Sequence, residues 1–330
     1  MSEAKVGDDV YGEDTTVDEL QKKLAQICGK EAGLFVPSGT MSNLIAVGTH
    51  CQRGDEMIIG KQNHIYWYEG GGASAFMGVA MHSIENAEDG SLPLEAIRAA
   101  IRPVNDHFPR TSLVALENSH NLKGGSILPL SYCKQVRALC DEYKLQLHLD
   151  GARLWNSAVA SGHHPAELAE SFDTVSVCLS KGLGTPAGSV LLGKKQFITQ
   201  AKRIRKALGG GMRQSGVIAA AGLYALENNM VRLVDDHARA ARLAGALQDS
   251  QQDIIFNVSK PATNIIYFSV RSNLGPPFCT FLKNRGILMN SYGSTRVRAV
   301  THLDISDADI DYVIASVREV VKELQEIKNT

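Results

Sequence analysis

The chain has 330 residues, of which 44% are hydrophobic, so it is long enough to form one large domain or two of ordinary size. Its formal net charge of -1 at pH 7 provides no electrostatic attraction to nucleic acid or to an anionic membrane surface, and both are excluded as expected partners. The sequence contains no run of about 18 apolar residues, which excludes a membrane-spanning helix.

The cysteines and the N-terminal segment bear on the cellular compartment. The acidic start MSEAKVGDDVYGED has neither a signal-peptide core nor an Arg-rich presequence. The six cysteines show neither CxxC nor zinc-finger spacing, and most lie in apolar runs, so we expect buried free thiols rather than a disulfide framework (Cys28, Cys51, Cys133, Cys140, Cys178 and Cys279). Because free thiols favour a reducing compartment, we predict a cytoplasmic protein.

Predicted strands and helices alternate along the first two-thirds of the chain. Thr16 and Glu19 have the spacing of a capping box, which predicts a helix from Thr16 to about Cys28. Short apolar runs predict strands at residues 33–36, 55–60, 79–84, 112–118, 145–152, 174–181 and 188–193. Helices are predicted between them at residues 41–51, 65–76, 93–102 and 131–144. This alternation predicts an α/β fold with a mostly parallel sheet that is covered on both faces.

The pattern of elements changes near Asn229. Beyond that residue the sequence predicts a long helix over residues 231–248 and an apolar β run over 264–270. A helix over 276–286, a second β run over 296–304 and a final helix over 307–325 follow. We therefore predict two domains, a large domain over residues 1–228 and a smaller C-terminal α+β domain over residues 229–330.

Two ionisable residues each follow a buried β run. Asp150 ends LQLHLD and Lys181 ends TVSVCLSK, so both are expected at the carboxyl edge of the sheet, where open α/β folds bind ligands. A buried lysine is costly unless it is paired or covalently modified, and a desolvated amine can form a Schiff base with a carbonyl cofactor. A strand-end aspartate suits a protonated pyridine nitrogen. A simple ion pair at the strand edge is the alternative interpretation.

Three further segments carry candidate ligand-binding residues. Ser38, Gly39 and Thr40 lie between a strand and a helix, where backbone N–H groups and two hydroxyls can bind a phosphate, although helix capping explains the same residues. His64 begins an aromatic and glycine-rich stretch that can stack on a flat cofactor, but a lone histidine is more often structural. Arg213 follows three glycines on a loop that can approach another backbone closely.

A family resemblance rests on segments that occur in order along the whole chain: VGDDVYGED, PSGTMSN, the region around His64, ENSHNLKGG, HLDGARLWN, SVCLSKGLGTPAGS, GGGMRQSG and RVRAVTHLD. DGAR followed by SKGLG is the most specific combination among them. The chain resembles the low-specificity L-threonine aldolases, which belong to the β-eliminating lyase group of pyridoxal 5′-phosphate (PLP) enzymes. The resemblance implies a PLP-dependent transferase-like fold (fold type I, the aspartate-aminotransferase type) with a mostly parallel central sheet.

The resemblance also implies a role for each matching residue. Lys181 would bind PLP covalently as a Schiff base, Asp150 would hydrogen-bond its pyridine nitrogen, and His64 would stack on its ring. The other implied assignments are Ser38, Gly39 and Thr40 to the phosphate, Arg153 to the cofactor site, Arg153 and Arg298 to the substrate α-carboxylate, His120 to the substrate side chain, and Lys206 and Arg213 to the cofactor phosphate, in some relatives across a subunit interface. For Lys206 and His120 a structural role is the alternative. No pattern of metal ligands stands out.

The implied activity is a lyase reaction on an amino-acid substrate. L-Threonine, L-allo-threonine or another β-hydroxy-α-amino acid would be cleaved to glycine and an aldehyde, which is acetaldehyde for threonine. His64 or His120 would take the β-hydroxyl proton, directly or through a water, and the sequence does not choose between them. The resemblance further implies a homodimer or homotetramer with active sites at the dimer interface. Another PLP reaction, namely β-elimination, transamination or racemisation, is an alternative.

The N-terminal segment departs from the family pattern. The family usually carries a segment with an Arg-Ser-Asp-Thr stretch upstream of VGDDVYGED, whereas only Met1–Lys5 precede Val6 here. Because that segment lies beside the active site in the family, its absence would weaken substrate binding and the dimer. A PLP-fold protein of low or altered activity is therefore a further alternative.

Overall fold

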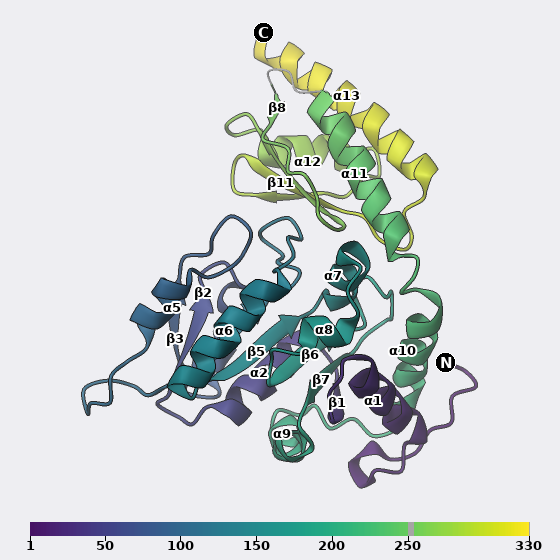
Figure 1. Ribbon diagram of the computed structural model, residues 1–330. Helices are drawn as coiled ribbons and strands as arrows, with labels where there is room; N and C mark the ends of the chain where they lie inside the picture. The colour runs from purple at the N-terminus through teal and green to yellow at the C-terminus, as the bar shows by residue number, and fades with distance from the viewer. Residues whose placement is uncertain (250–253, 330) are drawn as a thin grey trace. The chain divides into compact units, whose positions relative to one another are not determined.

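The computed structural model describes residues 1–249 and 254–329 and is shown in Figure 1. It divides into two compact units, each described here by itself. The first comprises Met1–Lys123 and Ile127–Met230, and the second comprises Gly124–Ser126 and the chain from Val231 onward.

The first unit is built on a seven-stranded sheet. Its strands follow the order β1 (Ala32–Val36), β7 (Ser189–Gly193), β6 (Thr174–Cys178), β5 (Gln146–Gly151), β4 (Thr111–Glu117), β2 (Glu56–Gly60) and β3 (Ala80–Ile84). Only β7 is antiparallel to its neighbours, and the other pairs in the sheet are parallel. In Figure 1, α6 crosses the front of the sheet and α2 lies behind it. The predicted α/β fold with a mostly parallel sheet is confirmed.

The helices of the first unit cover this sheet and connect its strands. They are η1 (Asp9–Tyr11, a 3-10 helix), α1 (Thr15–Ile27), α2 (Gly39–His50), α3 (His64–Trp67), α4 (Gly72–Ala75), α5 (Leu94–Ala100), α6 (Leu130–Tyr143), α7 (Leu154–Ser161), α8 (Pro165–Ala169), α9 (Lys195–Ala207) and α10 (Gly216–Asn228). Two of these helices differ from the sequence prediction. Asp14, rather than Thr16, caps α1, because its carboxylate accepts the N–H of Val17 at 3.1 Å. The helix predicted over 65–76 is two short helices, since Gly70 and Gly71 adopt positive φ between them.

Strand β5 shows how the sheet positions polar side chains. Side chains alternate between the two faces of a strand, so His148 and Asp150 share one face and Leu147 and Leu149 share the other. All four are buried. Asn43 on α2 hydrogen-bonds to both His148 and Asp150, which shows that their face is the one covered by α2.

The second unit contains a four-stranded antiparallel sheet with helices. Its strand order is β10 (Asn290–Tyr292), β11 (Arg296–Val300), β9 (Ile265–Val270) and β8 (Ile255–Phe256). The helices are α11 (Leu233–Asp249), α12 (Gly275–Lys283) and α13 (Asp307–Asn329), which agree with the three helices predicted there. Phe268 of β9 and Phe278 of α12 meet edge to face in its core, with ring centroids 5.7 Å apart.

Two further sequence predictions concern the whole chain. All six cysteines are free thiols, and all but the half-buried Cys279 are buried, which confirms the prediction made from their spacing. Among the helices that the structure describes, none combines the length and apolarity needed to cross a membrane.

Candidate active site

A cavity of about 170 Å³ lies in the first unit at the carboxyl edge of its sheet. Three neighbouring strands end at this edge. Glu117 of β4 pairs in register with Asp150 of β5, and β6 ends beside β5 at Cys178. The cavity brings together six residues predicted from the sequence: Ser38, Gly39, Thr40, His64, Asp150 and Lys181. Its lining also includes Asn43, Glu69, Ala152, Cys178 and Ser180.

Lys181 is held in the loop that follows β6. The Lys181 carbonyl accepts the N–H of Gly184 at 2.8 Å, and Gly184 adopts a φ of 73°, which favours glycine. The Leu179 N–H is bonded to the Gly188 carbonyl at 3.1 Å, so both sides of the loop are fixed. The amine therefore reaches the cavity from a short, anchored turn, and the side chain is half-buried.

Asp150 enters the cavity from the end of β5. It is only 2% exposed, and a buried carboxylate is costly unless its oxygens accept hydrogen bonds. Its Oδ1 accepts the N–H of Ala152 at 3.1 Å, and its Oδ2 accepts from Asn43 Nδ2 at 3.0 Å. Both oxygens are thus fixed in position.

The N-terminus of α2 forms another wall of the cavity. Ser38 is the N-cap residue, and its hydroxyl accepts the N–H of Met41 at 3.2 Å. The first N–H groups of a helix have no acceptor within the helix, and they carry the positive end of its dipole. Gly39 and Thr40 contribute such groups here, so this wall suits a phosphate.

His64 faces the cavity beside a carboxylate that the sequence prediction missed. Its Nδ1 donates to Glu69 Oε1 at 2.9 Å, with 28% of the His64 side chain and 4% of the Glu69 side chain exposed. Burial alone would lower the pKa of His64, but the hydrogen bond to Glu69 and the charges of Asp150 and Glu69 raise it above its ordinary value. Burial also raises the pKa of Glu69. The pair therefore holds a proton strongly.

Asn43 is the second residue that the sequence prediction missed. Its side-chain amide donates to Glu69 Oε1 at 2.8 Å and to Asp150 Oδ2 at 3.0 Å, and its Oδ1 accepts from His148 Nε2 at 3.1 Å. His64, Glu69 and Asp150 also present possible metal-ligand atoms within 4.8 Å of one another. The hydrogen bonds among them and to Asn43 account for this proximity.

Two buried histidines continue the network away from the cavity. His148 Nδ1 lies 2.9 Å from Thr174 Oγ1, and His50 Nε2 lies 2.8 Å from the same hydroxyl. Burial lowers the pKa of His148 to about 4 and that of His50 to about 3. Both rings are therefore neutral at pH 7. Because His148 Nε2 carries the proton that is donated to Asn43, its Nδ1 can accept a hydrogen bond from the Thr174 hydroxyl.

The buried neutral His148 predicts that acid destabilises the first unit. The unfolded chain takes up a proton near pH 6.5, whereas folded His148 does so only near pH 4, so stability is lost as pH falls from 6.5 towards 4. For this residue alone we expect the free energy of unfolding to fall by about 2 kcal/mol between pH 7 and pH 5. The readout is the fluorescence of Trp67 and Trp155 during urea unfolding, because both tryptophans lie in the first unit.

His148→Gln should remove this part of the pH dependence, since glutamine can still donate to Asn43 but does not titrate. His163→Gln, at an exposed position, is the control and should keep the wild-type slope. An unchanged slope in His148→Gln would contradict the assignment.

His120 lies apart from the cavity lining. It is fully buried, and its Nε2 is 3.1 Å from Asn63 Oδ1 and 3.3 Å from Asn86 Nδ2. A Cβ on Gly90 would lie 2.9 Å from the His120 Cβ, so the ring is tightly enclosed. Burial lowers its pKa below the ordinary value for histidine. Of the two histidines proposed as bases, only His64 therefore lines the cavity.

The predicted arginines have different positions. Arg153 is half-buried at the N-cap of α7, next to Ala152 of the cavity lining. Arg298 is half-buried on β11 of the second unit. Its binding to a substrate carboxylate remains a prediction.

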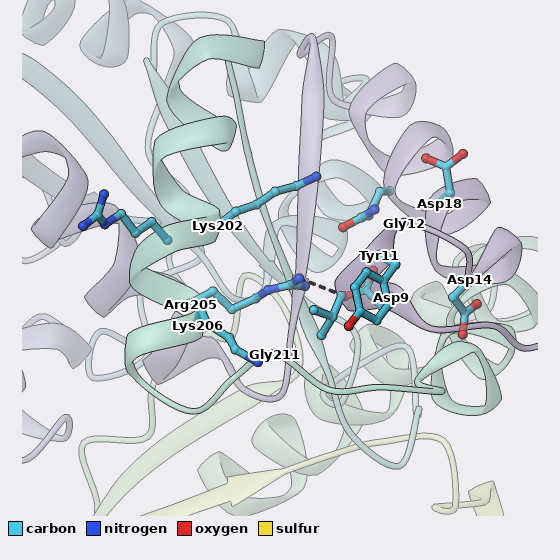
Figure 2. A pocket seen from close by; sticks show the side chains of 12 residues that line it. Asp9, Tyr11, Gly12, Asp14, Asp18, Lys202, Arg205, Lys206 and Gly211 are labelled. Atoms are coloured by element: carbon cyan, nitrogen blue, oxygen red, sulfur yellow. Dashed lines mark ion pairs between the residues drawn. The ribbon is translucent and has the colours of Figure 1, made fainter.

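Lys206 and Arg213 lie elsewhere in the first unit. Lys206 lines a second cavity, of about 490 Å³, and Figure 2 shows it on α9 near Lys202 and Arg205, opposite Asp9 and Tyr11. Arg213 pairs with Asp8 through contacts of 2.6 and 2.9 Å, and its guanidinium lies 5.6 Å from the centre of the Tyr11 ring. Neither residue belongs to the lining of the Lys181 cavity. The structure does not bring these two together with the other predicted cofactor ligands.

The donors around the first cavity fit the chemistry of PLP. An amine can bind its aldehyde, a buried carboxylate can pair with its pyridine nitrogen, and a helix N-terminus with two hydroxyls can bind its phosphate. The imidazole of His64 supplies a flat ring on the same cavity. Lys181, Asp150, Ser38, Gly39, Thr40 and His64 are the residues that would hold the cofactor.

Comparison with known proteins agrees with this chemistry. The chain is 44% identical over 315 residues to the low specificity L-threonine aldolase of Escherichia coli (strain K12), covering 96% of this chain and 92% of that protein. It is 42% identical over 336 residues to low-specificity L-threonine aldolase 1 of Arabidopsis thaliana, covering 100% and 94%. The structure of Leishmania major threonine aldolase superposes with a TM-score of 0.81 at 20% identity, covering 97% of this chain and 93% of that chain, and shows a shared fold.

A family model covers most of the sequence. Residues 1–272 match the β-eliminating lyase family, whose threonine aldolase members are PLP-dependent lyases. The match includes every residue that lines the Lys181 cavity. With the extent of the matching relatives, it shows that this chain belongs to the β-eliminating lyase family.

Proposed function

We propose that this chain is a PLP-dependent aldolase that cleaves L-threonine and L-allo-threonine to glycine and acetaldehyde. The observation that carries the proposal is the single cavity that joins Lys181, Asp150, His64 and the N-terminus of α2. The names of the relatives that are 42% and 44% identical over nearly the whole chain support the same reaction.

The cofactor site follows from the fixed groups around the cavity. Lys181 holds PLP through a covalent bond to its amine, and Ser38, Gly39 and Thr40 bind the phosphate at the positive end of α2. When bound, PLP withdraws electrons from the substrate and so weakens the bond between Cα and Cβ. Asp150 stabilises a proton on the pyridine nitrogen, because its two oxygens are held in place by Ala152 and Asn43.

The substrate is positioned and deprotonated by side chains. The guanidinium groups of Arg153 and Arg298 bind the α-carboxylate, for which planar paired donors are suited. His64 accepts the β-hydroxyl proton, because it lines the cavity, whereas the fully buried His120 does not line it. A positioned acid–base group of this kind contributes about 10²–10⁴-fold to the rate.

The proposal extends to the assembly and the cellular location. The chain forms a homodimer or homotetramer in which active sites lie at the dimer interface, and the separation of Lys206 and Arg213 from the Lys181 cavity of their own chain supports a role in a neighbouring subunit's site. The proposed division into a PLP-binding domain over residues 1–228 and a small domain over residues 229–330 lies close to the two compact units, except that Gly124–Ser126 group with the second unit. The free cysteines support a cytoplasmic location.

The purified chain with PLP and L-allo-threonine tests the proposed reaction. Acetaldehyde and glycine released in equal amounts are the expected products, and acetaldehyde is measured through NADH consumption by alcohol dehydrogenase. Ammonia with a 2-oxo acid would instead indicate β-elimination, an amino-group transfer would indicate transamination, and loss of optical activity would indicate racemisation. Any of these without acetaldehyde overturns the proposal.

A further inference from the structure

Two buried carboxylates of the first unit face the same small cavity. Glu69 is 9% exposed and Asp150 is 2% exposed, and both line the space beside Lys181. Like charges in a shared, poorly solvated site repel each other and raise the free energy of the ionised pair. A group that donates to both carboxylates at once offsets this cost.

Asn43 provides such a group. A side-chain amide has two N–H donors and one carbonyl acceptor. The donors of Asn43 meet Glu69 and Asp150 at 2.8 and 3.0 Å, and its carbonyl accepts from the buried, neutral His148 at 3.1 Å. Because these contacts fix its orientation, Asn43 couples the position of Glu69 to that of Asp150.

We propose that Glu69 is a positioning residue for His64, anchored by Asn43, and that this unit sets the orientation and tautomer of the imidazole at the active site. The Nδ1 of His64 donates to Glu69, so Nε2 is the ring nitrogen that accepts a proton when the ring is neutral. The backbone of His64 is fixed separately, since its N–H donates to Glu117 Oε2 at 2.7 Å. The inference rests on the proposed function for its catalytic meaning, but its geometry does not.

The charges around His64 predict the sign of the effect. Glu69 and Asp150 favour the protonated ring, whereas burial and the amine of Lys181 disfavour it. The aromatic ring of Tyr68 lies 5.6 Å away, between ring centroids. Removing the Glu69 charge while keeping its shape should therefore lower the pKa of His64.

Glu69→Gln in the full chain without cofactor tests this directly. We expect the NMR titration of the His64 ring to move to lower pH, as loss of a neighbouring opposite charge requires. The resonance is assigned by its absence in His64→Asn. Glu69→Asp keeps the charge, so it should move the His64 titration less than Glu69→Gln does. It serves as a second variant if Glu69→Gln does not fold.

Glu56→Gln is the matched control, because Glu56 is also a buried carboxylate of the first unit but pairs with Arg102 and His82. It should leave the His64 titration unchanged. Equal titrations in wild type, Glu69→Gln and Glu56→Gln would overturn the inference.

A second readout links the inference to catalysis. In the PLP-loaded enzyme, Glu69→Gln should move the acidic limb of the kcat/KM profile to lower pH, while a merely structural role would lower activity equally at every pH. A His64 shift without acetaldehyde release at any pH would sustain the positioning role and overturn the aldolase proposal. Acetaldehyde release without a shift in either the His64 titration or the acidic limb of the kcat/KM profile would sustain the aldolase proposal and overturn the positioning role of Glu69.

Discussion

Lys181→Ala is expected to abolish the visible PLP absorption band and to lower acetaldehyde release by roughly 10³-fold or more. The amine is the cavity's group for covalent attachment, and alanine cannot replace it. The anchored turn around Lys181 depends on backbone hydrogen bonds, so the fold should survive the substitution. The measurements are the absorbance spectrum with PLP and the rate with L-allo-threonine.

Lys22→Ala is the control for this experiment, since the Lys22 side chain is 76% exposed and pairs with Asp18 on its own helix. It should keep both the band and the rate. A folded Lys181→Ala protein with wild-type spectrum and rate would show that another amine holds the cofactor.

Asp150→Asn is expected to give the second largest loss, about 10²–10³-fold in kcat at saturating PLP. The substitution removes the negative charge that stabilises a protonated pyridine nitrogen. It also turns the NH₂ group of the new asparagine towards either Ala152 or Asn43, whose N–H groups donate to the two carboxylate oxygens of Asp150 in the native chain. We expect weaker PLP binding as well, which fluorescence titration measures.

The matched control is Asp55→Asn, at another buried aspartate of the first unit. Asp55 pairs with Arg110 and Ser112 instead of cavity residues. The control separates loss of a buried charge in general from loss at the site. Equal kcat in Asp150→Asn and wild type would contradict the assigned role of Asp150.

The sheet and most residues of the Lys181 cavity could be predicted from the sequence, because each is indicated by a short stretch of neighbouring residues. Continuous apolar runs mark the buried strands, and Asp150 lies at the end of β5 while Lys181 lies in the loop just after β6. Parallel strands bring their carboxyl ends to one edge, so two residues far apart in sequence were predicted to meet. The glycine and the capping residues around Ser38 predicted, in the same way, a helix N-terminus that suits a phosphate.

Asn43 and Glu69 could not be predicted by that reasoning. Asn43 lies within an apolar helix, where its partners on β5 depend on which face of the strand the helix covers. Glu69 lies beside His64 because the helix that begins at His64 already ends at Trp67, whereas the sequence prediction continued it to residue 76. The nearness of Glu69 to His64 in a glycine-rich segment was the one signal available.

The capping residue predicted for α1 was wrong for a different reason. Thr16 and Glu19 matched a capping box by spacing, but Asp14 takes the cap because its two oxygens bond both Val17 of its own helix and Gly216 of α10. A contact with a residue 202 positions away outweighs the local pattern. Local spacing therefore predicts that a helix begins, but not which residue caps it.

Borohydride reduction of the PLP-loaded chain, followed by tryptic peptide mapping, tests the central claim most directly. Reduction makes the bond between the cofactor and its lysine permanent, and a modified lysine resists trypsin. We predict that the cofactor label lies in a peptide over residues 154–194 that is uncut at Lys181. A label at any other lysine, with Lys181 cleaved normally, would contradict the account.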